Sequence, residues 1–270
     1  MKRIRLLSVV LVVFAFGAAA ARAKAPAAKS ELPRVEGPKF DKAKFVSEGY
    51  VCLFNGKDLT GWVAPKGDNG HWKVIDGVID YDAQSEARGS KNLVSKEAFG
   101  DFQLHIEWRL KRTTGLYPMP TILPDGSYKK DAAGKVIHKR MPNADSGVFL
   151  RGSGKAQLNI WCWPAGSGEM WGVRNDRKLP AALRAAATPK LKADNPVGQW
   201  NAFDVTVKGD GVNVVLNGKK VIVNARVPGM PKTGPITLQH HGGKNKKTGK
   251  FSPASSLIQF RNIYIKRLDK

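Results

Sequence analysis

The chain has 270 residues, of which 45 are Lys or Arg and 22 are Asp or Glu, so its formal net charge is +23. This length suits one sizeable all-β domain, and two cysteines exclude a scaffold stapled by many disulfides. A positive excess can indicate nucleic-acid binding. The basic residues are dispersed, however, so we expect no nucleic-acid partner and instead a solvated cationic surface attracted to anionic envelope polymers.

The first 25 residues have the layout of a secretory signal peptide. Lys2 and Arg3 precede an apolar run from Leu6 to Phe16, and small residues follow, with possible cleavage after Ala23 or Ala25. The run is shorter than the roughly 20 residues needed to cross a bilayer. We therefore expect residues 1–25 to be removed, and the mature protein to be periplasmic or extracellular without a stable membrane span.

Residues 26–48 are rich in Ala, Pro and Lys and show little periodicity, which predicts a flexible tether. The domain itself is then expected at 49–270. Export would permit a disulfide between Cys52 and Cys162, but buried, unreactive thiols are the commoner outcome for two cysteines so far apart in the sequence.

Strand patterns dominate the domain. Residues 72–81 form two β-prone runs joined by Asp76-Gly77, and residues 212–223 repeat this layout around Asn217-Gly218, which predicts two tight hairpins. Pro180 to Ala187 is the one segment that favours a short helix.

The segment Phe102 to Leu110 alternates between apolar and polar residues, so one face of this strand is hydrophobic and the other carries Glu107 and Arg109. Similar alternation recurs at 203–207 and 257–266. Many short strands separated by Gly, Asp and Asn turns predict an all-β, antiparallel sandwich.

The stretch between Lys111 and Asn143 lacks the alternation of a strand and contains several Pro and Gly residues. Long segments without regular structure are uncommon in compact domains and are often functional. The segment is expected either to cover one end of a binding groove as a lid or to form a mobile excursion.

Polar and aromatic side chains gather after position 145. Gln157, Asn159, Trp161 and Trp163 share one parity, so one sheet face can carry both amides and indoles. Such a face is suited to a polar, ring-shaped ligand, for which a sugar is the obvious candidate. Core packing is the simpler alternative for either indole.

An ordered set of motifs resembles the 3-keto-disaccharide hydrolase domain family, also described as a 3-keto-glucoside 1,2-lyase and 3-keto-2-hydroxy-glucal hydratase domain. The motifs are Leu53 to Trp62, Trp72 to Gly77, Ile106 to Arg109, Ser146 to Arg151, Gly198 to Asn201, Leu216 to Gly218, Gly234 to Gly242 and Phe260 to Ile263. They keep their order over about residues 50–268. The resemblance implies a concanavalin A-like jelly-roll sandwich whose concave sheet binds carbohydrate.

Two departures from the family pattern concern chemistry. Asp145-Ser146-Gly147 stands where the family usually has Asn-Ser-Gly, and Gln157-Leu158-Asn159 stands where it has Glu-x-Gln. The carboxylate has become an amide, which can hydrogen-bond but cannot take a proton. The chain is then either a member with relocated chemistry or a non-catalytic, lectin-like binding descendant.

The family chemistry implies cleavage of a 3-keto-glycoside by elimination through a 2-hydroxy-glucal, followed by hydration. The 3-keto group acidifies the hydrogen on C2, so such a site needs a base there, donors at the O3 oxyanion and an acid for the leaving oxygen. A conventional glycosidase instead needs two carboxylates. Glu107 and Glu169 would supply them in that alternative.

The catalytic candidates are Glu107, Arg151 and His240. Glu107 is expected to act as a base or metal ligand, or else to pair structurally with Arg109 or Arg151. Arg151 would clamp hydroxyls or stabilise the oxyanion, or form a surface ion pair. His240 and His241 point to opposite faces of a regular strand, and His240 is favoured through the family pattern Gln-x-His-Gly.

The remaining candidates concern binding. Gln157 and Asn159 would bind sugar hydroxyls, and Trp161 and Trp163 would provide stacking. Glu169 would add a carboxylate from a Gly-rich loop. Asp145 would support a divalent metal ion such as Ca²⁺ through oxygen ligands, and no other cofactor is expected.

Overall fold

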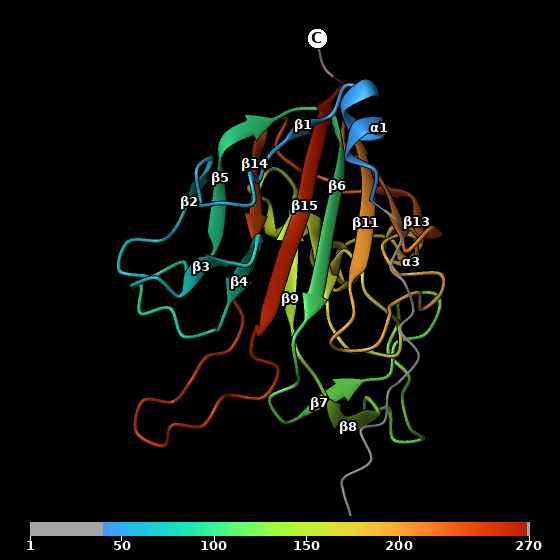
Figure 1. The fold of residues 1–270 in the computed structure, drawn as a ribbon. Helices are drawn as coiled ribbons and strands as arrows, with labels where there is room; N and C mark the ends of the chain where they lie inside the picture. Colours follow the sequence, from blue (N-terminus) through green and yellow to red (C-terminus); the bar gives the residue numbers. More distant parts are fainter. Residues whose placement is uncertain (1–39, 269–270) are drawn as a thin grey trace, which may run out of the picture. The chain divides into compact units, whose positions relative to one another are not determined.

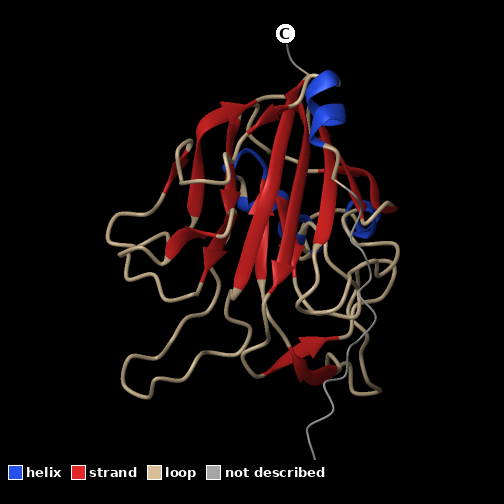
Figure 2. Cartoon of the chain, in the orientation of Figure 1, coloured by secondary structure: helices blue, strands red, loops and turns tan. Residues whose placement is uncertain are grey.

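A computed structural model describes residues 40–268 (Figure 1). The predicted signal peptide at 1–25, and the predicted tether as far as residue 39, lie outside the described residues. Strands dominate the described part, and the helices are short (Figure 2). No helix in this part has the length and apolar character needed to cross a membrane.

The strands form two main antiparallel sheets. The first has the order β13-β12-β11-β6-β15-β4-β3, with β1 paired to β15. Its members are β1 (Val51–Cys52), β3 (Trp72–Ile75), β4 (Val78–Tyr81), β6 (Phe102–Leu110), β11 (Asn201–Lys208), β12 (Gly211–Leu216), β13 (Lys219–Arg226) and β15 (Ile258–Arg267).

The second sheet has the order β10-β9-β14-β5-β2. Its members are β2 (Trp62–Val63), β5 (Leu93–Phe99), β9 (Ser146–Phe149), β10 (Gln157–Ile160) and β14 (Gly234–Leu238). The sheets enclose one hydrophobic core, to which Ile106 and Phe260 contribute from the first sheet and Val148 and Leu158 from the second. The predicted antiparallel jelly-roll sandwich is confirmed.

Local patterns account for individual elements. Both predicted hairpins form, because Asp76-Gly77 and Asn217-Gly218 adopt the positive φ angles that a tight turn needs. On β6 the apolar residues face the core, as their alternation predicted. The predicted short helix is α3 (Ala181–Ala186), which begins directly after Pro180. A second short helix, α2 (Trp171–Arg174), precedes it.

Residues 40–48, the part of the predicted tether that the structure describes, contain a short helix. Helix α1 (Lys42–Ser47) starts at Asp41, whose side chain accepts a hydrogen bond from the Lys44 backbone nitrogen at 3.1 Å. The rings of Phe40 and Phe45 lie 5.4 and 4.7 Å from that of His105 on β6. Residues 40–48 therefore pack on the outer face of the first sheet, which differs from the expected tether at 26–48.

The irregular segment after Lys111 folds into a small hairpin of β7 (Leu116–Pro120) and β8 (His138–Pro142). Met119 packs with Trp161 and Trp163 in a second hydrophobic cluster. The hairpin thus covers the indoles that follow β10. Both cysteines are free thiols, with Cys52 exposed and Cys162 half-buried.

Candidate functional site

Polar and aromatic side chains surround a cleft of about 270 Å³ on the outer face of the five-stranded sheet. The lining residues are Tyr117, Asp145, Gln157, Asn159, Trp161, Trp163, Trp171, Gln239 and His241. Along β10, Leu158 and Ile160 point into the core, so Gln157 and Asn159 point to the cleft. The expectation that the two amides and the two indoles share one face is met geometrically.

Three side-chain amides form the floor of the cleft. Gln157 donates from Nε2 to Asn159 Oδ1 at 2.5 Å and to Gln239 Oε1 at 2.8 Å. A Cβ atom at Gly147 would lie 2.9 Å from Gln239 Oε1 and 3.0 Å from Gln157 Nε2, so only glycine leaves room for this arrangement. No hydrogen bond among residues 40–268 uses the side-chain nitrogen of Gln239, which is therefore available to a ligand.

Asp145 and His241 form the ionisable part of the cleft. His241 Nε2 lies 4.0 Å from Asp145 Oδ2, and its Nδ1 lies 2.7 Å from the Ala254 carbonyl oxygen. Because a carbonyl only accepts, Nδ1 carries the hydrogen and Nε2 of the neutral ring keeps a lone pair toward the cleft. Burial raises the pKa of the Asp145 carboxyl to about 7, although His241 opposes this shift.

The aromatic residues of the cleft differ in accessibility. Trp161 and Trp163 stack on each other with ring centroids 3.9 Å apart, and both are buried. Trp171, at the start of α2, is 42% exposed and is the indole that a ligand can reach. Sequence reasoning missed Trp171, and the available signal was a lone Trp between the buried Met170 and Gly172.

Glu169 lies behind the cleft rather than in it. Its fully buried carboxylate pairs with Arg174 and accepts a hydrogen bond from Asn159 Nδ2 at 3.2 Å. Burial raises its pKa to about 7, and Arg174 limits the rise. Glu169 therefore supports Asn159 from beneath, and the expectation that it offers a carboxylate from a flexible loop is wrong.

Glu107 lies on β6 in the opposite sheet and does not line the cleft. Its Oε2 accepts a hydrogen bond from Arg261 Nε at 2.6 Å, and its Oε1 lies 3.8 Å from His105 Nε2. Burial alone would raise the pKa of Glu107, but hydrogen bonds and the charge of Arg261 hold it below its usual range. Glu107 therefore cannot act as a base in the cleft, and its structural partner is Arg261 in place of the expected Arg109 or Arg151. Parity within a strand does not specify the sheet that the strand joins.

Arg151 is also absent from the cleft. It follows β9 in a left-handed conformation with φ of 51°, which turns its side chain away from the strand's polar face. The buried guanidinium donates to the carbonyl oxygens of Gly100, Gly209 and Pro231 and to Asp101 Oδ1. The expected role at the sugar is contradicted by this geometry, and Arg151 instead ties three loops together.

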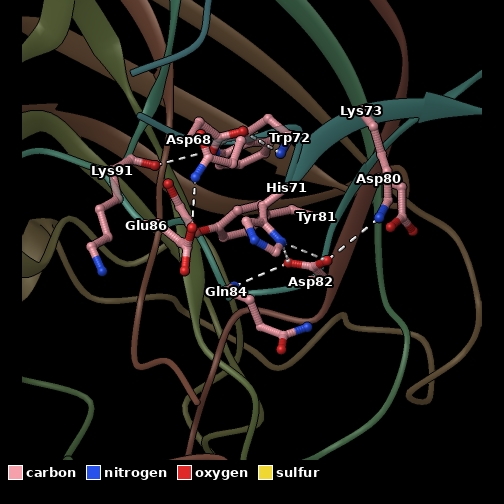
Figure 3. A network of polar contacts seen from close by, with 12 residues as sticks. Asp68, His71, Trp72, Lys73, Asp80, Tyr81, Asp82, Gln84, Glu86 and Lys91 are labelled. Atoms are coloured by element: carbon pink, nitrogen blue, oxygen red, sulfur yellow. Dashed lines mark hydrogen bonds and ion pairs between the residues drawn. The ribbon is translucent and has the colours of Figure 1, made fainter. Parts of the chain in front are cut away.

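His240 points away from the cleft. Its Nδ1 lies 2.5 Å from the hydroxyl of Tyr81, which stacks on Trp72. Figure 3 shows this region, where polar contacts join His71 to Asp82 beside Tyr81. The choice of His240 over His241 is wrong, and counting Gln-x-His-Gly from Gln239 to Gly242 in fact puts the pattern's His at 241.

The donor set at Asp145 does not fit a divalent cation site. Its ionisable neighbour in the cleft is the His241 imidazole, and the other polar groups there are amides. No group of three His, Cys, Asp or Glu side chains suited to a metal converges within residues 40–268. Ca²⁺ takes six to eight oxygen ligands, so the described residues make a poor cage for it.

A second cavity of about 250 Å³ adjoins the cleft at Trp161. Trp108, Cys162 and Lys192 are among its lining residues. Trp161 lines both spaces and donates from Nε1 to the Gly166 carbonyl oxygen at 2.7 Å. A single indole thus belongs to two neighbouring cavities.

A β-sandwich with amides, an accessible indole and an Asp–His pair on one outer sheet face has the architecture of a carbohydrate-active domain. The chain matches the 3-keto-alpha-glucoside-1,2-lyase-like domain over residues 49–266 and belongs to that family. The resemblance found in the sequence motifs is thereby confirmed. No curated protein matches the chain.

Solved structures with this architecture are similar to the chain. A candidate glycosyl hydrolase from Parabacteroides distasonis is 20% identical, with a TM-score of 0.53 over 87% of this chain and 100% of its own. A second candidate glycosyl hydrolase of that species is also 20% identical, with a TM-score of 0.45 over 81% and 99%. A Bacillus subtilis carbohydrate-binding module is 14% identical, with a TM-score of 0.37 over 76% and 95%.

Proposed function

We propose that the cleft cleaves 3-keto-glycosides by elimination followed by hydration. Family membership supports the substrate class. The observation that carries the proposal is the Asp145–His241 pair, which places a proton acceptor and a carboxyl group with a pKa of about 7 side by side among sugar-binding amides. A carboxyl group that titrates near neutral pH suits general acid–base catalysis.

In the elimination step, His241 Nε2 removes the proton from C2 of the keto sugar. The electron pair of that C–H bond forms an enediolate conjugated with the 3-keto group, and the C1–O bond then breaks. Protonated Asp145 donates its proton to the leaving oxygen, so the aglycon departs as an alcohol. His241 is now protonated and Asp145 ionised.

The hydration step reverses these roles. Ionised Asp145 takes a proton from water while the oxygen of that water adds to C1 of the 2-hydroxy-glucal. Protonated His241 returns its proton to C2, which restores both side chains to their starting states. The net reaction is hydrolysis of the glycosidic bond, and it requires no outside oxidant or reductant.

The amides bind the sugar and stabilise the enediolate. The free side-chain nitrogen of Gln239 is a donor for O3, where negative charge develops. Asn159 is held by Glu169, and Gln157 by its two amide partners, so neither must reorganise during the reaction. Trp171 offers an exposed indole for stacking on the sugar ring.

Purified protein incubated with a 3-keto-glucoside and with the matching plain glucoside tests this proposal. Aglycon release only from the keto sugar is expected, and the release should disappear in Asp145→Asn. Release from the plain glucoside would support the two-carboxylate alternative, although Glu107 and Glu169 stand on different parts of the fold. A parallel incubation with chelator tests the divalent cation, which stays an untested expectation.

A lectin-like module is the second candidate function. The amide at Gln157, where the family usually has a carboxylate, favours it, because amides bind hydroxyls without proton transfer. Calorimetry that detects binding of both the keto and the plain sugar, with neither being cleaved, would replace the catalytic proposal with this one.

We also propose that the protein is exported, on the basis of the pattern in residues 1–25. Its cationic surface would then face anionic envelope polymers. N-terminal sequencing of the protein recovered from a periplasmic or secreted fraction should begin after Ala23 or Ala25. An uncleaved N-terminus in the cytoplasmic fraction would overturn this.

A further inference from the structure

A separate cavity of about 280 Å³ lies between the turn at residues 126–130 and the helices α2 and α3. Its lining residues are Gly126, Ser127, Tyr128, Lys130, Arg174, Asn175, Arg177 and Arg184. Four of these are cations, and none carries a carboxylate. The lining is therefore basic, unlike that of the amide-lined cleft, although Arg174 is paired with Glu169 and the carboxylate of Asp125 is close enough to feel the charge of Arg184.

Arg174 differs from the other cations of this cavity because it is buried. Arg174 is only 1% exposed, and its guanidinium pairs through Nε with the buried carboxylate of Glu169. The Nη2 nitrogen has no hydrogen-bond partner among residues 40–268, and neither does Arg184 Nε. A buried donor without a partner is costly, so these nitrogens point to a missing acceptor.

The walls of the cavity hold Arg174 in place. The ring of Tyr128 lies 4.9 Å from the Arg174 guanidinium carbon, and its hydroxyl donates to Asn175 Oδ1 at 3.0 Å. A Cβ atom at Gly126 would lie 2.7 Å from Thr188 Oγ1 and 2.9 Å from the Arg184 carbonyl oxygen. Glycine thus lets the turn press against α3 and close one side of the cavity.

We propose that this cavity binds a tetrahedral oxyanion, a phosphate or sulfate group. Several oxygens on one centre can accept from both unpartnered arginine nitrogens at once, and arginine presents its donors in a planar fork suited to such groups. Lys130 and Arg177 add charge at the more exposed rim. The group can arrive as a free ion or as a substituent on a saccharide.

The cavity is coupled to the cleft through three side chains. Arg174 pairs with Glu169, and Glu169 accepts the hydrogen bond from Asn159, which lines the cleft. An oxyanion at Arg174 Nη2 would share this guanidinium with Glu169, which pairs with it at Nε. The oxyanion site itself does not depend on cleavage of a glycoside, so a binding measurement tests it without reference to activity.

Isothermal calorimetry on the full chain, at constant ionic strength set with sodium chloride, tests the proposal. Inorganic phosphate and sulfate are titrated beside glucose 6-phosphate, with glucose as the neutral control. Saturable binding of the anions is expected. A sugar ester that binds about tenfold more tightly than the free ions identifies a substituted glycan as the ligand, and equal affinities identify the free ion.

Single substitutions test whether the anion binds in this cavity. Arg184→Gln and Arg177→Gln should each raise the anion Kd by about tenfold, because each removes a charge-assisted hydrogen bond or its field. Lys178→Gln is the matched control, since Lys178 is an exposed neighbour that does not line the cavity. Unchanged melting temperatures show that these variants fold. Absence of saturable anion binding, or an equal loss of affinity in Lys178→Gln, overturns the proposal.

Discussion

The imidazole Nε2 of His241 faces the Asp145 carboxylate at 4.0 Å, while the other ring nitrogen is fixed by the Ala254 carbonyl oxygen. This relationship sets the tautomer of the histidine and places two titratable groups at one end of the cleft. The carboxylate that the family pattern puts on β10 is replaced by Gln157, which pairs with Phe149 at one end of the β9–β10 ladder, whereas Asp145 lines the same cleft at the other end, next to Ser146.

The two adjacent histidines provide a matched pair of variants. His241→Gln should lower kcat for the keto substrate by roughly 10²–10⁴, the usual contribution of a general base. His240→Gln should leave kcat near that of the wild type and lower stability by about 1 kcal/mol through the lost contact with Tyr81. Aglycon release and thermal melting measure the two effects, and a larger kcat loss in His240→Gln would contradict the assignment.

The raised pKa of Asp145 makes stability depend on pH. The folded carboxyl holds its proton up to a pKa of about 7, whereas an unfolded Asp releases it near pH 3.9. The folded state therefore binds more protons between these values, so this contribution to stability falls as pH rises from about 4 to 7.

Asp145→Asn should remove this part of the pH dependence and raise the free energy of unfolding at pH 8 by on the order of 2 kcal/mol. Denaturant titrations at pH 5 and pH 8 measure it. Glu48→Gln, which removes an exposed carboxylate of α1, should keep the wild-type slope. A slope in Asp145→Asn equal to that of the wild type would refute the raised pKa of this half-buried carboxyl.

Arg151 is expected to matter for stability and not for the chemistry. Arg151→Lys keeps the charge but cannot reach three carbonyl oxygens and Asp101 together, so we expect a loss on the order of 2 kcal/mol. Arg226→Lys alters an exposed pair with Asp210 and should change stability little. Chemical denaturation compares them, and a fall in kcat of folded Arg151→Lys would return Arg151 to the mechanism.

Substitutions of two cleft indoles should separate effects on sugar binding from effects on stability. Trp171→Ala removes the exposed ring and should weaken sugar binding about fivefold with little change in melting temperature. Trp163→Ala empties a buried position stacked on Trp161 and should cost about 3–5 kcal/mol of stability. Calorimetry and melting curves provide both readouts. An unchanged sugar affinity in Trp171→Ala would rule out the stacking role.

Much of the fold could be predicted from local sequence patterns. Alternation on 102–110 marks the core face of β6, and the Asp-Gly and Asn-Gly pairs mark the hairpins. The site was only partly predictable. Parity along β10 groups Gln157 with Asn159, but it cannot say which sheet Glu107 joins.

The orientations of two other side chains could not be predicted from sequence patterns. The left-handed backbone at Arg151 ends the alternation of β9 and redirects the guanidinium, and nothing in a non-glycine residue announces such a turn. Helix α2 has only four residues, too few for a 3.6-residue period to reveal that Trp171 faces outward. Long-range packing decides both.

Trp161 borders the sugar cleft and the adjoining space near Trp108 and Cys162. Its side chain therefore contributes to the walls of both spaces. We expect a smaller side chain at position 161 to enlarge both spaces, which measure about 250 and 270 Å³. A single substitution at this position should therefore change the size of the ligand that the cleft admits.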